Sequence, residues 1–206
     1  MNRPLNIDKY LKKYAVSPMR SLRTASVADV DQAVVIPALA ESFSLFRTLS
    51  CIAANPSGEL RRTLVVCVVN NHRPPVASED EIRDNQVTLT ILKEFIEGRK
   101  PSIAGPAVLR GDLERIAGSG LRLGCIDASS ADAEIPDRDG GVGTARKIGM
   151  DAALAILSGR GPGGGVICCL DADTLVMENY LAAIYAYFSK TDDPAAVAGY
   201  AHQKPA

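Results

Sequence analysis

The sequence predicts an α/β protein with a mostly parallel sheet and helices on both faces. Its 206 residues suffice for one domain with a buried core, and 47% apolar against 23% charged residues is the balance of a globular protein. Short, continuous apolar runs alternate with longer segments whose apolar residues recur every three or four positions. Continuous apolar strands are buried on both sides, which is typical of parallel strands covered by two helical layers.

The expected strands are short apolar runs rich in valine, isoleucine and cysteine: residues 33–37, 63–71, 121–129, 166–170 and 195–201. The expected helices share a helical spacing of apolar residues: 5–15, 41–55, 85–98, 142–159 and 177–190. Residues 99–120, rich in glycine, proline and charge, show no clear pattern, and residues 130–141 are expected to form an acidic loop. These segments predict alternating strands and helices along most of the chain.

The first segment differs in charge from the rest. Residues 1–24 carry six lysine or arginine residues and only Asp8 as an acidic residue. We therefore divide the chain into a basic N-terminal helix or extension, residues 1–24, and a domain over residues 25–206. We expect the helix to dock on its own domain, and contact of this basic amphipathic helix with a membrane surface is the alternative.

Bulk properties exclude several classes of function. The net charge of −1 provides no global field that would favour nucleic acid, so no nucleic-acid partner is expected. The five cysteines form no Cys-x-x-Cys pair and lie mostly in apolar runs, which favours a reducing, cytoplasmic location. No signal peptide is expected, and no apolar stretch approaches the roughly 20 residues that a transmembrane helix needs.

Two carboxylates follow the apolar run 166–170. Asp171 and Asp173 are one residue apart, so in an extended chain they would point to the same side. Ligands of open α/β sheets bind at the carboxyl ends of the strands. Close carboxylates share a proton or bind a cation, and Mg²⁺ typically takes one or two carboxylates together with phosphate oxygens and water. The pair therefore predicts a metal-bound phosphate or diphosphate, and an ordinary strand end before a helix is the alternative.

Four stretches, in this order, resemble family 2 glycosyltransferases. They are VVIPALAESFSLFRTLSCI, LVVCVVNN, GGVGTARKIGMDAAL and VICCLDADTLVMENYLAAI, within residues 33–199. The resemblance implies the GT-A fold of nucleotide-diphospho-sugar transferases. It also implies metal-dependent transfer of a sugar, with Mn²⁺ or Mg²⁺, from a UDP- or GDP-linked donor to an acceptor that the sequence does not identify.

The resemblance also implies roles for residues at the ends of the first two strands. Pro37, Ala38 and Glu41 would border the base and ribose of the nucleotide. Asn70 stands where the family commonly has an aspartate that recognises the base. Leu39 and Ala40 replace the family's usual tyrosine and asparagine, which removes a stacking or hydrogen-bonding edge, and Asn70 and Asn71 replace its acidic pair, so recognition of the base is expected to differ here.

The remaining implied roles concern the diphosphate. Arg146 would lie near it, since a guanidinium group matches phosphate through its planar fork of donors. Asp171 would lie near the ribose or sugar, and Asp173 would bind the metal ion on the diphosphate, so both are candidate metal ligands. Lys147 replaces an asparagine that is usual in the family.

Three other functions remain open at this point. The chain carries no identifiable general base and is expected to lack the acceptor part of the fold, so a non-catalytic sugar-nucleotide-binding module is one alternative. A sugar nucleotidyltransferase is another, although such enzymes should carry a glycine-rich, basic loop where this chain has PALAESFS. Haloacid-dehalogenase-like phosphotransferases also begin with Asp-x-Asp, but they need a lysine and further aspartates well downstream, and few residues follow Asp173.

Overall fold

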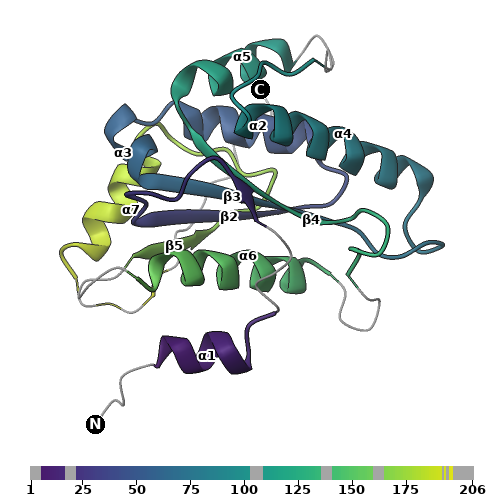
Figure 1. The fold of residues 1–206 in the computed structure, drawn as a ribbon. Coiled ribbons are helices and arrows are strands. Elements are labelled where there is room, and N and C mark those ends of the chain that lie inside the picture. The colour runs from purple at the N-terminus through teal and green to yellow at the C-terminus, as the bar shows by residue number, and fades with distance from the viewer. Residues whose placement is uncertain are drawn as a thin grey trace.

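The computed structural model describes residues 6–16, 22–102, 109–135, 141–159, 165–191, 193 and 195–196. One five-stranded sheet lies between helices on both sides, so the predicted α/β class is confirmed (Figure 1). The order of the strands across the sheet is β1-β4-β3-β2-β5. Their bounds are β1 Arg23–Thr24, β2 Gln32–Ala38, β3 Thr63–Asn70, β4 Arg122–Ala128 and β5 Val166–Cys169.

The sheet is mixed, which corrects the expectation of a mostly parallel sheet. Strand β2 pairs in parallel with β3 and β5, and β3 pairs in parallel with β4. Strand β1 pairs antiparallel with β4 at one edge, with Arg23 opposite Cys125. Strand β1 was not expected, because Arg23 and Thr24 form no apolar run. The four expected strands between residues 33 and 170 are confirmed, with ends shifted by no more than one residue.

Seven helices are present among the described residues. They are α1 Ile7–Lys13, α2 Ser42–Ala53, α3 Ser57–Arg62, α4 Glu79–Ile96, α5 Arg110–Ser119, α6 Val142–Leu157 and α7 Tyr180–Phe188. Helices α3 and α5 were not expected. Helix α4 begins at Glu79 rather than at residue 85 because Ser78 and Glu81 form a capping box, each side chain accepting the other residue's backbone N–H.

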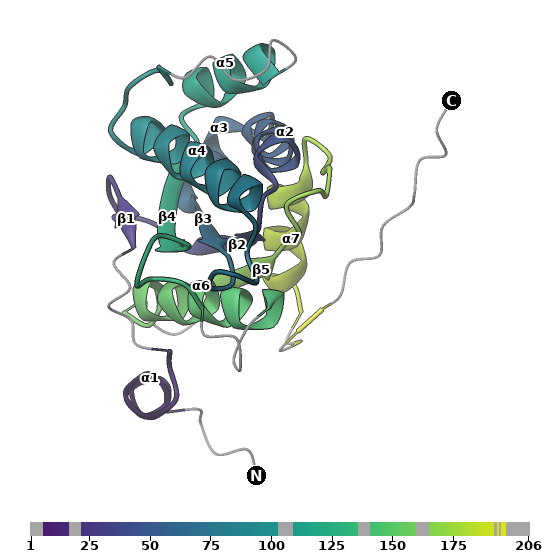
Figure 2. The ribbon, with the colours of Figure 1, turned by 90° about the vertical axis from the view of Figure 1, so that its right-hand side faces the viewer.

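The alternating side chains of the central strands form two cores. On one face, residues such as Ile36 and Cys67 pack with apolar residues of α2, α4 and α5. On the opposite face, residues such as Val35 and Val68 pack against α6. Figure 2 shows α2 and α4 on one side of the sheet and α6 on the other. The prediction of helices on both faces is therefore confirmed.

Helix α6 lies very close to the sheet at Gly149. A Cβ atom at this position would overlap Cγ1 of Val35 and lie 2.9 Å from Cγ2 of Val68. Both valines are fully buried. By contrast, a Cβ at Gly143 of the same helix would meet no heavy atom of the described residues within 4 Å. The missing side chain of Gly149 therefore sets the distance between α6 and the sheet.

The N-terminal helix α1 is docked on α6, as expected, through polar contacts. The hydroxyl of Tyr10 donates to Oδ1 of Asp151 (2.9 Å), and the backbone N–H of Val16 donates to Oδ2 (2.8 Å). The ammonium group of Lys147 donates to Tyr10 Oη, Tyr14 O and Asp151 Oδ2. Since α1 buries no residue fully, these contacts are its main attachment. The division of the chain at residue 24 stays a prediction.

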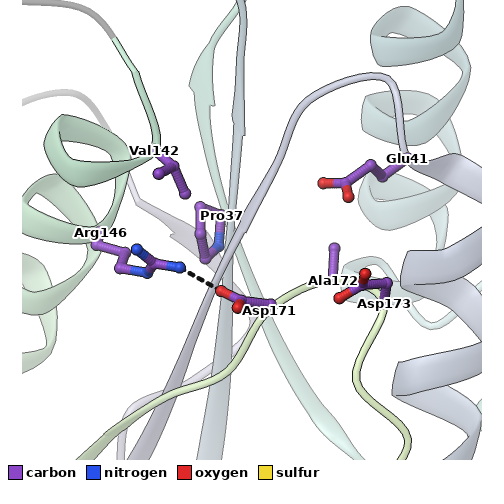
Figure 3. A pocket seen from close by; sticks show the side chains of 7 residues that line it. All are labelled: Pro37, Glu41, Val142, Arg146, Asp171, Ala172 and Asp173. Carbon is purple, nitrogen blue, oxygen red and sulfur yellow. Dashed lines mark hydrogen bonds and ion pairs between the residues drawn. The ribbon is translucent and has the colours of Figure 1, made fainter. Parts of the chain in front are cut away.

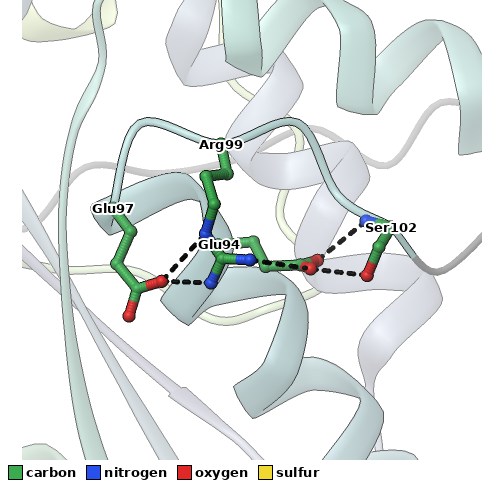
Figure 4. Close-up of polar contacts among 4 residues, drawn as sticks. All are labelled: Glu94, Glu97, Arg99 and Ser102. Carbon is green, nitrogen blue, oxygen red and sulfur yellow. Dashed lines mark hydrogen bonds and ion pairs between the residues drawn. The ribbon is translucent and has the colours of Figure 1, made fainter.

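The end of α4 is joined to the following loop by a buried carboxylate. Glu94 accepts hydrogen bonds from the backbone N–H of Ser102 (2.9 Å) and from its hydroxyl (2.5 Å), and it pairs with Arg99 at 3.6 Å (Figure 4). Arg99 also contacts Glu97. The hydrogen bonds from Ser102 hold the pKa of Glu94 below its ordinary value, with a smaller contribution from Arg99.

Two further expectations concern the rest of the chain. Residues 195–196 are not in a strand, and the remainder of the expected strand 195–201 lies outside the described residues, as does 136–140 of the expected acidic loop. In the part of the chain that the structure describes, none of the helices combines the length and apolar character needed to span a membrane.

Candidate functional site

The order of the strands places the candidate site. From β2 the chain proceeds through β3 to β4 on one side, whereas β5 pairs with the opposite side of β2. The carboxyl ends of β2 and β5 therefore meet at the point where the strand order reverses, which is where open α/β sheets bind ligands. A pocket of about 260 Å³ lies there. It is lined by Pro37, Glu41, Val142, Arg146, Asp171, Ala172 and Asp173 (Figure 3).

Five of the seven sequence-predicted site residues line this pocket, and Ala38 and Asn70 do not. Ala38 is 2% exposed and packs in the core on the α2 side of the sheet. Asn70 is 3% exposed at the end of β3. Val142 and Ala172 were not predicted, although both lie within the motifs that carry the resemblance.

The two aspartates do not continue the strand, contrary to the extended geometry assumed from the sequence. Strand β5 ends at Cys169, and the N–H of Thr174 donates to Asp171 O (3.1 Å), which closes a turn. Thr48 of α2 anchors this turn through a hydrogen bond from its hydroxyl to Ala172 O (2.7 Å). The carboxylates consequently diverge: Figure 3 shows Asp171 directed at Arg146 and Asp173 on the side of Glu41.

Arg146 and Asp171 form an ion pair at one side of the pocket. The guanidinium group, carried by α6, donates to Oδ1 of Asp171. The two side chains are 34% and 58% exposed, so solvent screens their attraction and such a pair contributes at most about 1 kcal/mol. An anion that attracts Arg146, or a cation that attracts Asp171, can therefore replace the partner at low cost.

Glu41 faces the pocket from the side opposite Arg146 (Figure 3). Burial raises the pKa of Glu41 above its ordinary value, and the neighbouring carboxylates Asp173, Asp171 and Asp84 raise it further. The backbone N–H of Leu39 donates to Oε2 of Glu41 (3.3 Å) and opposes this rise. Burial is the larger cause of this shift and the neighbouring carboxylates add to it, a crowding of negative charge that a cation would relieve.

The acidic side chains match a divalent ion in donor chemistry but do not form a complete set of ligands. Among the described residues, no group of three or more histidine, cysteine, aspartate or glutamate side chains could hold a metal ion. Mg²⁺ is commonly bound by only one or two carboxylates, with the other ligands supplied by water and substrate phosphates. Asp171 and Asp173 fit that mode once Asp171 is released from Arg146.

The opposite side of the pocket favours an anion. Helix α6 begins at Val142, which lines the pocket, directly after Gly141. Gly141 has φ = +103°, a conformation that favours glycine, and it supplies no side-chain cap. The first turn of a helix carries partial positive charge and N–H groups that bind phosphate oxygens. Together with Arg146, this helix start forms an anion-favouring side.

Two residues of α4 hold the loop that carries Glu41, and sequence reasoning missed both. Asp84 accepts hydrogen bonds from the N–H and the hydroxyl of Ser42, and Asn85 accepts one from the N–H of Ala40. Neither residue lines the pocket. The only signal for them in the sequence is that both are polar and precede Leu89 and Leu92, which are apolar and buried on the same helix.

Comparison of the chain with family models, with curated proteins and with solved structures finds no match in any of the three.

Proposed function

We propose that the pocket binds a nucleoside-diphosphate sugar together with Mg²⁺ or Mn²⁺, and that the chain is the donor-binding part of a glycosyltransferase of the GT-A type. The observation that carries this proposal is the division of one pocket into two sides. Asp173 and Glu41 lie opposite Arg146 and the start of α6, and Asp171 lies between the two sides, paired with Arg146. A metal–diphosphate complex presents a cation and an anion together, whereas a simple anion or cation would use only one of the two sides.

The size of the pocket limits what it can hold. Sites for drug-sized ligands typically measure about 300–1,000 Å³. The pocket of about 260 Å³ therefore matches the metal ion and diphosphate rather than a whole nucleotide sugar. In this proposal, the base and the sugar extend beyond the pocket on either side. The buried Asn70 does not contact the base while it stays 3% exposed.

The chain's own residues would act by binding and orienting the donor. Arg146 moves from Asp171 to the diphosphate, which leaves the carboxylate oxygens of Asp171 and Asp173 for the ion. Glu41 lies beside Asp173 and adds negative charge to the cation side. When bound, the metal ion neutralises the charge that builds on the departing nucleoside diphosphate. We assign no general base.

All five cysteines are free, which supports a cytoplasmic location.

Calorimetric titration tests this function. UDP and GDP are titrated with and without Mn²⁺ into the wild-type chain, Asp173→Asn and Asp80→Asn. Asp80 is a matched control because its side chain is 90% exposed and lies on α4 outside the pocket. We expect one nucleotide to bind more tightly with Mn²⁺, and Asp173→Asn to weaken only that metal-dependent binding by about tenfold or more. Binding that ignores both Mn²⁺ and Asp173→Asn would refute the proposal.

Turnover then separates the enzyme from the binding module. Hydrolysis of UDP- and GDP-linked sugars by this chain, lost in Asp173→Asn, would support a glycosyltransferase. Metal-dependent binding of the nucleotide without hydrolysis, with any longer native form of the protein equally inactive, would favour the non-catalytic alternative.

A further inference from the structure

A buried asparagine on α4 connects the loop after β2 with the end of β3. Asn85 is 1% exposed. Its Oδ1 accepts from the N–H of Ala40 (2.9 Å), and its Nδ2 donates to Asn70 O (3.1 Å) and to Asn71 Oδ1 (3.0 Å). Because Ala40 presents a donor and Asn70 an acceptor, the partners dictate the orientation of the amide. The backbone N–H of Asn71 in turn donates to Ala128 O at the end of β4 (3.4 Å).

The loop held by Asn85 has an unusual backbone. Ala40 has φ = +52°, a conformation that residues with a Cβ atom rarely adopt. In this conformation the N–H of Ala40 meets Asn85, and the N–H of Leu39 meets the carboxylate of Glu41. A loop of this kind persists only where its surroundings hold it. Asn85 is the side chain that holds Ala40.

The neighbouring residue of α4 fixes the other end of the loop. Asp84 accepts from the N–H of Ser42 (3.0 Å) and from its hydroxyl (2.5 Å), so it caps the start of α2 from outside the helix. Glu41 lies between the two attachments. Its direction into the pocket is therefore set by α4, an element that does not itself line the pocket.

We propose that Asn85 is a positioning residue, whose buried amide holds the loop between β2 and α2 so that Glu41 faces the pocket beside Asp173. The proposal rests on the proposed function, because the position of Glu41 matters for activity only if a metal–diphosphate complex binds beside it. Its structural content is independent of any ligand and can be measured in the free protein.

The first test follows the ionisation of Glu41 by ¹³C NMR, with the signal assigned by Glu41→Gln. The charged groups that face Glu41 are Asp171 and Asp173 after β5, Asp84 on α4 and Arg146 on α6. Burial is the main cause of the raised pKa of Glu41. In Asn85→Ala the loop is released and Glu41 becomes more solvated, so we expect its pKa to fall toward the ordinary value.

The second test measures affinity for UDP in the presence of Mn²⁺. We expect Asn85→Ala to weaken binding about tenfold, the usual effect of removing a residue that orients a metal-site group. Thr88→Val is the matched control, because Thr88 lies one turn further along α4, is 1% exposed, and has a hydroxyl with no hydrogen-bond partner among the described residues. This variant should leave both the affinity and the titration of Glu41 unchanged.

The outcomes are distinct. An unchanged Glu41 titration in a folded Asn85→Ala variant would overturn the positioning role, even if thermal stability fell. If the wild-type chain does not bind UDP with Mn²⁺, the proposed function fails, and the titration alone then decides the role of Asn85. If Asn85→Ala does not fold, Asn85→Ser is measured in its place, because serine preserves a small polar side chain and leaves less buried space.

Discussion

The substitution Gly149→Ala measures how closely α6 rests on the sheet. The added methyl group would overlap Cγ1 of Val35 and lie 2.9 Å from Cγ2 of Val68. Both valines are fully buried and β-branched, so they cannot rotate away at low cost. The helix must therefore move outward, and Arg146, which lies about one turn earlier on it, moves away from Asp171.

The magnitude follows from two opposing effects. Overpacking a core of this kind costs about 1–3 kcal/mol, and two stiff contacts place Gly149 at the upper end, about 2–3 kcal/mol. Alanine in a helix interior is favoured over glycine by about 1 kcal/mol. The net expectation for Gly149→Ala is a loss of about 1–2 kcal/mol in the free energy of unfolding.

Gly143→Ala supplies the control within the same helix. A Cβ at Gly143 meets nothing within 4 Å in the part of the chain that the structure describes, so this substitution should be neutral or stabilise by up to about 1 kcal/mol. Urea denaturation of the three proteins gives the comparison, and the difference between the two variants, about 1–3 kcal/mol, isolates the overlap. Equal stability of Gly149→Ala and Gly143→Ala, within about 0.5 kcal/mol, would refute the close packing of α6.

Three further predictions address other parts of the fold. Tyr10→Phe removes a donor from the buried Asp151 and should speed amide hydrogen exchange in α1 about fivefold to tenfold, whereas Tyr14→Phe, which leaves Tyr10 in place, should not. Ser78→Ala removes the capping box of α4 and should lower the free energy of unfolding in urea by about 1 kcal/mol; no change would contradict the cap. Because folding lowers the pKa of Glu94, its contribution to stability is present above the unfolded-state pKa and is lost as pH falls through the folded-state pKa. In urea denaturation at decreasing pH, the wild type should therefore lose its stability advantage over Glu94→Gln in acid. A difference in stability that stays constant with pH would exclude this linkage.

The central strands could be predicted because their signal is local. Runs such as 63–70 are almost entirely apolar and rich in valine. This composition is typical of a strand that is buried on both faces of a sheet. Strand β1 carried no such signal, since its two residues join the sheet only by pairing with β4. Helix α5 contains Gly111 and Gly118 and buries only Leu113 and Ile116, so its helical pattern is weak in the sequence.

The same division applies to the candidate site. Glu41, Arg146 and the two aspartates directly follow or begin elements that the sequence revealed, and all of them line one pocket. The divergence of Asp171 from Asp173 was not predictable, because it depends on a hydrogen bond from Thr48, which is 124 residues away along the chain from Ala172. The role of Asn85 was hidden for the same reason, since its contact with Ala40 spans 45 residues.

The ion pair between Arg146 and Asp171 makes the two halves of the proposed ligand thermodynamically linked. A divalent ion that binds alone must break the ion pair and leaves Arg146 without a new partner. A diphosphate that binds alone breaks the same pair and leaves Asp171 without a new partner. When both ligands bind, the ion pair is broken only once for the two binding events. Each ligand therefore increases the affinity for the other by an equal factor. For a solvent-screened pair worth at most about 1 kcal/mol, this route alone supplies a mutual enhancement of about fivefold.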